Sequence, residues 1–240
     1  MTVTTIPFTS LGGENHGWLD AKHHFSFANY YDPRRMGVGP LRVWNDDTIQ
    51  PGTGFPFHSH RDMEIITFVR DGAITHEDNL GNRGRTEAGD VQVMSAGTGI
   101  THSEFNLEDE ITRIFQIWII PDERGHKPRW DARQFPKGSR SGELVALASG
   151  RDVHAGTDAL AIHADSAVLG ATLDAGQDVK HTLDQRRALY VVPGKGAVSI
   201  GDAFVDTRDG AVVTAKDGDE EIVITADLDA EIVVVDVPLT

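Results

Sequence analysis

The sequence contains no cysteine among its 240 residues. This absence excludes disulfide bonds, catalysis by a thiolate and metal sites built from sulfur. Histidine and carboxylate side chains are the strong metal ligands that remain. The sequence also lacks any apolar run near the roughly 20 residues that a membrane-spanning helix needs. Its start, MTVTTIPFTS, has no basic segment followed by an apolar one. We therefore expect a soluble, cytoplasmic protein that does not bind membranes.

Basic residues are also scarce, and the formal net charge is −15. Residues 1–140 carry 15 basic and 19 acidic side chains, whereas residues 141–240 carry 7 and 18. An acidic surface repels phosphate backbones, so direct binding of nucleic acid is not expected. A small molecule or a protein is the more plausible partner. The uneven charge suggests two units, and we expect the protein to be a monomer.

Long helical periodicity is missing too, and short β-branched and aromatic runs bounded by Gly, Asp and Asn take its place. This pattern is typical of an all-β sandwich or barrel. The range 121–142, which is rich in proline, glycine and charge, is the best linker candidate. The runs that we predict to be strands are Glu64–Val69, Val91–Met94, Ile114–Ile120, Leu189–Val192, Ala211–Thr214, Glu221–Thr225 and Glu231–Val235.

The two halves follow similar plans. In each, a strand, a glycine turn and a second strand are followed by another glycine turn, and these glycines are Gly72 and Gly89 in the first half and Gly196 and Gly210 in the second. The repeat is weak by itself. Together with the uneven charge it favours two tandem β domains.

His58 and His60 are two residues apart, so on a strand both side chains leave the same face. A second pair with the same spacing, His102 and Glu104, follows the glycine-rich turn at 96–99. If the intervening strands run antiparallel, the two pairs can meet inside one barrel. Three imidazoles and one carboxylate leave open positions on a first-row transition ion. Such a set suits Fe(II) and also accepts Mn, Co, Ni or Cu.

The second half serves as an internal comparison. Alignment on the turn glycines places Thr182 and Asp184 opposite the first pair, and Val223 and Thr225 opposite the second. We therefore expect no metal site in the second half, although His181 lies near.

The sequence resembles the pirin family of the cupin superfamily, especially its bacterial flavonol-oxidising members. The resemblance extends over essentially the whole chain and is strongest from about Asn15 to Trp130. The motifs that carry it are Ser26–Pro33 (SFANYYDP), His58–Thr67 (HSHRDMEIIT), His76–Gly84 (HEDNLGNRG), Met94–Glu104 (MSAGTGITHSE) and Gln116–Ile119 (QIWI).

The resemblance implies a bicupin, an all-β protein of two tandem cupin barrels of the jelly-roll type. We place the metal-binding N-terminal domain at residues 1–135 and a degenerate C-terminal domain without a metal site at 136–240. The family pattern assigns one metal, Fe(II) first of all, to His58, His60, His102 and Glu104.

Five further residues have open roles. The general cupin pattern uses a glutamate at the position of Glu64; because pirins use the later glutamate, we expect Glu64 to orient a ligand imidazole instead. His76 has either a surface or structural role or a place in the cavity, because the sequence does not fix which way it faces. Gln116, on an apolar strand, needs a partner and is a candidate for the cavity. Phe55 and Phe57 either line the pocket mouth or pack in the core.

The resemblance implies a metal-dependent dioxygenase that cleaves flavonols such as quercetin at the 2,3-bond, with Glu104 as the base that takes the substrate's hydroxyl proton. The substrates are then a flat aromatic molecule and dioxygen. The alternative is a redox- or metal-responsive regulatory protein that acts through protein partners, as other pirins do. A third reading is a cupin reaction on a small keto compound that needs no dioxygen.

Overall fold

The computed structural model describes residues 1–135, 138 and 141–239, and nearly all of its regular structure is β-strand. Two short 3₁₀ helices, η1 (Phe8–Ser10) and η3 (Asp152–His154), lie between strands. Within these residues no helix is long and apolar enough to cross a membrane. The all-β prediction is confirmed.

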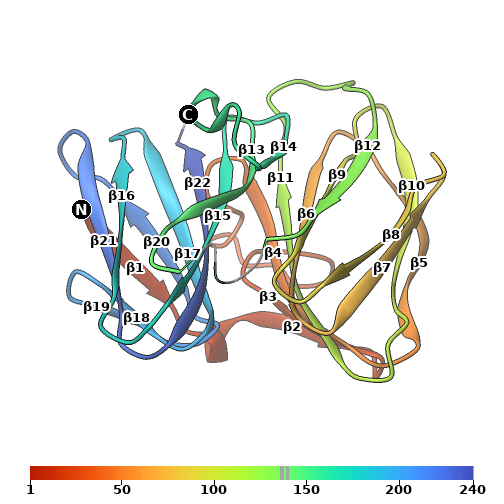
Figure 1. Cartoon of the computed structure of the whole chain (residues 1–240), viewed down its shortest axis with the longest axis horizontal. Coiled ribbons are helices and arrows are strands. Elements are labelled where there is room, and N and C mark those ends of the chain that lie inside the picture. Colours follow the sequence, from red (N-terminus) through yellow and green to blue (C-terminus); the bar gives the residue numbers. More distant parts are fainter. Residues whose placement is uncertain (136–137, 139–140, 240) are drawn as a thin grey trace.

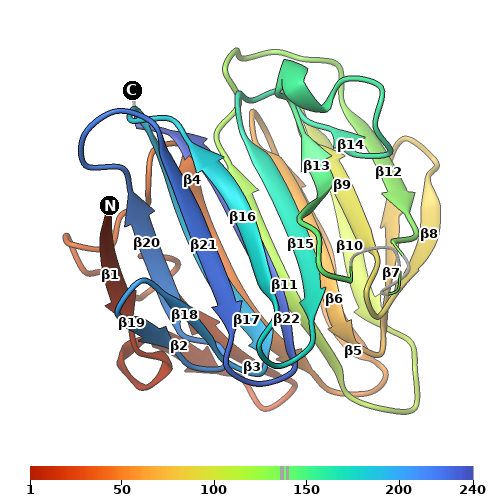
Figure 2. The ribbon, with the colours of Figure 1, turned by 60° about the vertical axis from the view of Figure 1, so that its left-hand side comes forward.

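We call strands β2 to β12 the first half of the protein. They form two sheets that face each other (Figures 1 and 2). The large sheet has seven strands in the order β12-β9-β6-β11-β4-β3-β2, and the small sheet has four in the order β5-β10-β7-β8. The strands are β2 (Gly12–Asn15), β3 (Leu19–His23), β4 (Leu41–Ile49), β5 (Thr53–His60), β6 (Glu64–Asp71), β7 (Ala73–Asp78), β8 (Arg83–Glu87), β9 (Val91–Ser95), β10 (Ile100–Asn106), β11 (Thr112–Ile119) and β12 (Arg129–Arg133).

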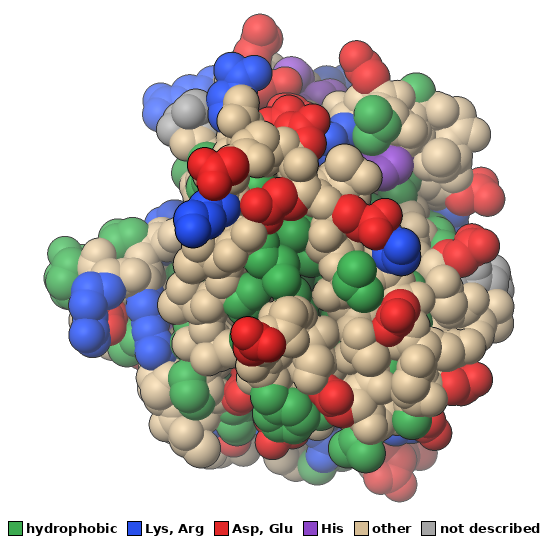
Figure 3. Space-filling view, turned by 90° about the vertical axis from the view of Figure 1, so that its left-hand side faces the viewer, with side chains coloured by type: hydrophobic (Ala, Val, Ile, Leu, Met, Phe, Trp, Pro, Cys, Tyr) green, Lys and Arg blue, Asp and Glu red, His purple; other side chains and the backbone are tan. Residues whose placement is uncertain are grey.

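The second half, strands β13 to β22 together with β1, repeats this plan. Its large sheet has seven strands, β1-β20-β17-β22-β15-β13-β14, and its small sheet has four, β16-β21-β18-β19. The strands are β1 (Thr2–Ile6), β13 (Val145–Ser149), β14 (Leu160–Ala161), β15 (Ala167–Leu173), β16 (Asp178–Leu183), β17 (Arg187–Lys195), β18 (Val198–Ile200), β19 (Ala203–Val205), β20 (Gly210–Thr214), β21 (Glu220–Ala226) and β22 (Ala230–Pro238). Two paired sheets in each half match the jelly-roll plan of a bicupin. Acidic side chains are spread over the outer face of the second half, in keeping with its charge (Figure 3).

All seven predicted strands are present, as β6, β9, β11, β17, β20, β21 and β22. The linker prediction for 121–142 is wrong in part, because β12 lies within that range and pairs with β9. The strand β1 pairs with β20 and so joins the second half's sheet (Figure 1). We keep 1–135 and 136–240 as a proposed division, with β1 added to the second sheet. The boundary between them borders residues that lie outside the described part of the chain.

The two large sheets pack face to face through one hydrophobic cluster. It contains Ile66 and Phe68 of β6, together with Tyr190 of β17 and Val235 of β22. The rings of Trp44 and Tyr190 lie 5.4 Å apart across this contact. The first half's large sheet is therefore buried on both faces. Along β6, even-numbered residues face the second half, whereas Thr67 faces the small sheet of its own half.

The interior of the second half is mainly an apolar core. Val179 and Leu183 of β16 and Ile222 and Ile224 of β21 are all buried in one cluster. The side chains of β16 that face inward are therefore odd-numbered, so our alignment of Thr182 and Asp184 was displaced by one residue. The strand that precedes the turn glycine has nine residues in β17 but eight in β6, and a shift of one residue reverses the face.

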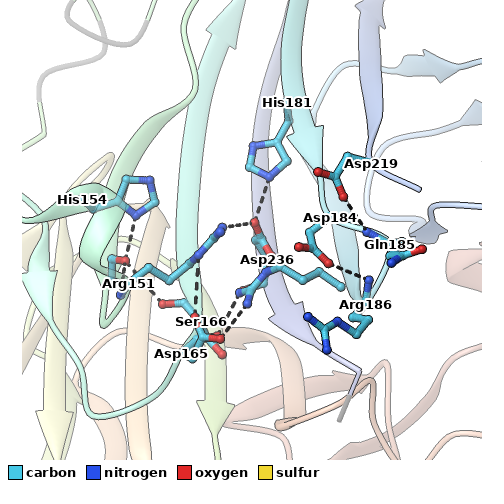
Figure 4. Close-up of polar contacts among 12 residues, drawn as sticks. Arg151, His154, Asp165, Ser166, His181, Asp184, Gln185, Arg186, Asp219 and Asp236 are labelled. Atoms are coloured by element: carbon cyan, nitrogen blue, oxygen red, sulfur yellow. Dashed lines mark hydrogen bonds and ion pairs between the residues drawn. The ribbon is translucent and has the colours of Figure 1, made fainter.

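A cluster of charges closes one end of this core (Figure 4). The Asp236 carboxylate, which is 1% exposed, accepts hydrogen bonds from His181 Nε2 at 2.8 Å and Arg187 Nε at 2.6 Å. Arg151 also contacts it, as the figure shows. Burial raises the pKa of Asp236, but these hydrogen bonds and the arginine charges more than offset it, so the pKa lies below its ordinary value.

We expect Asp236→Asn to destabilise the protein by about 3 kcal/mol, because it leaves the buried Arg187 and the half-buried Arg151 with only the exposed Asp165 as a counter-charge. Since the pKa of Asp236 is lowered by folding, this stabilisation is complete above about pH 4 and is lost as the pH falls further. Urea unfolding at pH 7 and pH 3 measures both effects. Lys180→Ala, which removes an exposed pair with Glu221, is the control and should leave stability unchanged. Equal stability of Asp236→Asn and the parent at pH 7 would contradict the prediction.

Candidate metal centre

The pairing of β10 with β5 brings the two predicted pairs together. His102 lies directly opposite His58 in this antiparallel ladder, and Ile100 lies opposite His60. One potential ligand atom from each of His58, His60 and His102 lies within 4.8 Å of the others. The prediction that the two motifs meet inside one half is confirmed for the three histidines.

The imidazoles have the chemistry that a metal ligand needs. His58 Nδ1 lies 2.8 Å from the carbonyl oxygen of Pro56, so it donates there and leaves Nε2 as a lone-pair donor. His102 Nε2 is buried and has no hydrogen-bond partner within the described residues. An orphaned buried nitrogen is costly unless an ion binds it. Three convergent imidazoles therefore fit a divalent transition metal.

Burial keeps two of these imidazoles neutral. It lowers the pKa of His102 to about 3, and the nearby His58 and His76 add to this effect. Burial, with the neighbouring His102 and His58, lowers the pKa of His60 to about 4. The deprotonated imidazole is the form that binds a metal.

A β-bulge directs Glu104. The β5–β10 register shifts between His102 and Glu104, so that Glu104 lies opposite Phe55. Such bulges re-aim side chains beside functional sites. The Glu104 side chain lines the same cavity as the histidines, but its oxygens are not part of the 4.8 Å cluster of ligand atoms.

Three uncharged side chains hold the buried carboxylate of Glu104. Gln92 Nε2 donates to Oε1 at 2.6 Å, and the Thr67 hydroxyl lies 3.1 Å from the same oxygen. Gln116 Nε2 donates to Oε2 at 2.8 Å. The prediction that Gln116 points into the cavity is confirmed. Gln92 was missed, although it is a polar residue within an apolar run, which is the signal that identified Gln116.

A cavity of about 360 Å³ opens above the histidines. Its walls are mainly apolar, and they include Phe27, Phe55, Phe57, Ile65 and Trp118. Phe55 and Phe57 therefore line the pocket, as one of the two readings predicted. A cavity of this size and lining suits a small, largely apolar ligand.

Asp47 is a second buried carboxyl group on the cavity wall. One of its oxygens is buried without a hydrogen-bond partner among the described residues. Burial raises the pKa of Asp47 well above its ordinary value, and the charges of Asp46 and Glu104 add to the rise. A neutral carboxyl group can donate a hydrogen bond. Sequence reasoning missed this residue, because an acidic pair on a strand carries no sign of its burial.

Glu64 does not orient a ligand imidazole, and that expectation was wrong. Its carboxylate accepts a hydrogen bond from Ser95 at 2.6 Å, and a backbone hydrogen bond from His163 of the second half lowers its pKa. Burial outweighs these effects, so the pKa of Glu64 is raised. As an even-numbered residue of β6, Glu64 lies on the face opposite Thr67.

His76 is buried, so a surface role is excluded. It lies opposite Glu104 in the β7–β10 ladder and therefore shares the inward face of the small sheet. Its Nδ1 lies 3.4 Å from His102 Nδ1, and its Nε2 lies 3.1 Å from Asp78 Oδ2. Burial raises the pKa of Asp78, but hydrogen bonds from Asn82 and His76 outweigh it and lower the pKa overall.

We expect the metal-free protein to bind one divalent transition ion per chain, and His102→Ala to weaken that binding by more than about 100-fold, beyond the range typical of outer partners. Calorimetric titration with the metal measures both. His16→Ala, which changes an exposed histidine, is the control and should bind as the parent does. Parent-like affinity in His102→Ala would contradict the assignment.

Comparison with known proteins agrees with this geometry. The model of the family described as Pirin matches residues 6–119, and that described as the quercetinase C-terminal cupin domain matches residues 147–237. A pirin-like protein of Caulobacter vibrioides is 60% identical over 230 residues, which are 96% of this chain and 97% of the relative. A quercetin 2,3-dioxygenase of Escherichia coli K12 is 41% identical over 228 residues, 95% of each chain.

A solved structure extends the likeness to three dimensions. The crystal structure of a bacterial pirin from Escherichia coli, in complex with nickel(II), superposes with a TM-score of 0.91 at 38% identity and covers 100% of both chains. Identity and coverage at this level extend over both halves. The chain belongs to the pirin family.

Proposed function

We propose that this protein is a metal-dependent flavonol 2,3-dioxygenase that acts on quercetin or a similar polyphenol. One flavonol and one dioxygen give one ring-opened ester and one carbon monoxide. The observation that carries the proposal is the placement of a buried carboxylate, Glu104, beside three convergent imidazoles in one apolar cavity. The relative from Escherichia coli named quercetin 2,3-dioxygenase supports the choice of substrate.

We propose His58, His60, His102 and Glu104 as the metal ligands, with Fe(II) as the ion that we expect and Mn, Co, Ni or Cu as alternatives. A bound ion of this kind supplies a Lewis acid with open positions for the substrate and dioxygen. The nickel(II) in the related pirin structure supports a divalent ion but does not select one.

In this proposal Glu104 accepts the proton of the flavonol's 3-hydroxyl group. The three uncharged donors around it, Gln92, Thr67 and Gln116, hold the carboxylate in one orientation. A positioned base of this kind typically contributes about 10²- to 10⁴-fold to a rate. A base that is also a ligand must exchange between the two roles, and the hydrogen-bonding side chains give it a fixed place when it is not bound.

The rest of the cavity would position the flavonol. Phe27, Phe55 and Trp118 present aromatic faces to a flat ring system. Elsewhere on the wall, Asn45 and Asp47 of β4 place polar groups near the substrate's oxygens, and burial raises the pKa of Asp47. The apolar walls keep bulk water from the reacting carbon atoms.

The cytoplasmic location and the monomeric state of the protein stay predictions.

We expect Glu104→Gln to lower flavonol-dependent oxygen uptake by about 10²- to 10⁴-fold, because the amide keeps the size of the side chain but cannot accept the proton. The measurement is oxygen consumption by iron-loaded protein given quercetin, with metal content determined for each sample. Glu77→Gln, an exposed carboxylate on the neighbouring strand β7, is the matched control.

Uptake as fast in Glu104→Gln as in the parent would exclude the base role. No uptake by fully loaded parent protein would exclude the dioxygenase itself. In that case the regulatory function becomes the leading hypothesis, and partner capture with oxidised and reduced metal would test it.

A further inference from the structure

The segment from His76 to Gly84 has no part in the proposed reaction, yet it is built around the metal centre. It comprises the end of β7, a tight turn and the start of β8, at the first half's outer end (Figure 1). Asn79 forms two hydrogen bonds with the backbone of Thr101, the residue before His102: its N–H donates at 2.9 Å and its Oδ1 accepts at 3.0 Å. The turn is thus fastened to β10 beside a candidate ligand.

The turn also fixes the carboxylate of Asp78. Oδ1 accepts the backbone N–H groups of Leu80 at 2.9 Å and Asn82 at 3.0 Å. Oδ2 accepts the Asn82 amide at 2.9 Å and faces His76 Nε2 at 3.1 Å. Because a carboxylate only accepts, the hydrogen of His76 is placed on Nε2.

This arrangement determines the hydrogen positions on the next imidazole. With its hydrogen on Nε2, His76 offers Nδ1 as an acceptor. His102 Nδ1, at 3.4 Å, must then carry the hydrogen and donate it, because two nitrogen atoms that each present only a lone pair cannot form a hydrogen bond. His102 Nε2 is left with a lone pair, and it is the nitrogen that is buried without a partner among the described residues.

The ring of His76 is itself held in place. It stacks on Trp130 with centroids 4.9 Å apart and planes 7° from parallel. Gly84 lies opposite His76 in the β7–β8 ladder, and a Cβ atom there would lie 2.2 Å from the Trp130 ring. Only glycine at this position leaves room for the indole. The ring cannot rotate without losing this stack and the bond to Asp78.

We propose that Asp78 and His76 form a relay that holds His102 in the tautomer and orientation in which Nε2 ligates the metal. The two act as positioning residues, because neither contacts the cavity or a substrate. A hydrogen bond from a ligand histidine to an outer partner fixes the ring and raises its basicity, and loss of such a partner typically costs about 10- to 100-fold in metal affinity. The relay concerns metal binding and holds whether or not the protein oxidises flavonols.

Two substitutions at His76 separate hydrogen bonding from packing. His76→Phe keeps a ring against Trp130 but removes the acceptor, and we expect about 10- to 100-fold weaker binding of nickel(II). His76→Asn loses the stack but places an amide oxygen near the position of Nδ1, and we expect affinity within about threefold of the parent. Competition with a chromophoric chelator measures both, and thermal unfolding of the metal-free proteins shows that each is folded.

A third variant leaves His76 in place. Asp78→Asn keeps an oxygen for Leu80 and Asn82 but turns an amide group toward His76 Nε2, which reverses the tautomers along the relay. We expect nickel(II) affinity to fall as in His76→Phe. Nitrogen NMR of ¹⁵N-histidine-labelled, metal-free protein should show the Nδ1–H tautomer of His102 in the parent and its loss in Asp78→Asn.

The outcomes are distinct. Weak binding by His76→Phe and Asp78→Asn with near-normal binding by His76→Asn supports the relay. Parent-like affinity of Asp78→Asn, weaker binding by His76→Asn than by His76→Phe, or an Nε2–H tautomer of His102 in the parent would overturn it. If His76→Phe does not fold, Asp78→Asn and the parent's NMR spectrum decide. Absence of nickel(II) binding in the parent would instead reject the metal centre itself.

Discussion

The antiparallel pairing of β10 with β5 and β7 is the interaction on which the metal centre depends. It sets His102 opposite His58 on one side and Asp78 on the other, so ligand and supporting residue share the inward face of one small sheet. The bulge after His102 lets the following carboxylate take a different path from the imidazoles. A slip of one residue in either ladder would turn these side chains outward.

The large sheet of the first half provides the opposite wall, and it is buried on both sides. Along β6, Ile66 and Phe68 enter the apolar contact with the second half, whereas Thr67 reaches Glu104 in the cavity. The same alternation sends Glu64 away from the histidines. The second half therefore acts on the site indirectly, because it covers the back of the sheet that holds the glutamate's partners.

The two halves show how one architecture serves two purposes. Both have a seven-stranded and a four-stranded sheet. In the first half polar side chains project into the space between the sheets, and they leave a cavity. In the second half Val179, Ile222 and Ile224 fill the equivalent space, and a cluster around Asp236 closes its end. That buried carboxylate is offset by the arginines of β17 and of the segment after β13, and it also accepts a hydrogen bond from His181 of β16.

Local patterns in the sequence were enough for the strands, the two-part organisation and the histidine motifs, because alternation and two-residue spacing act within a single strand. They also indicated that Gln116 required a partner. Only the tertiary structure decided which way the side chains of His76, Glu64 and Asp47 point. The direction of each side chain depends on which strand pairs beside its own strand and on which face a neighbouring sheet covers. The pairing of β1 with β20 in the second half's large sheet was also decided only by the tertiary structure, since no local pattern in residues 2–6 indicates a partner some 200 residues away.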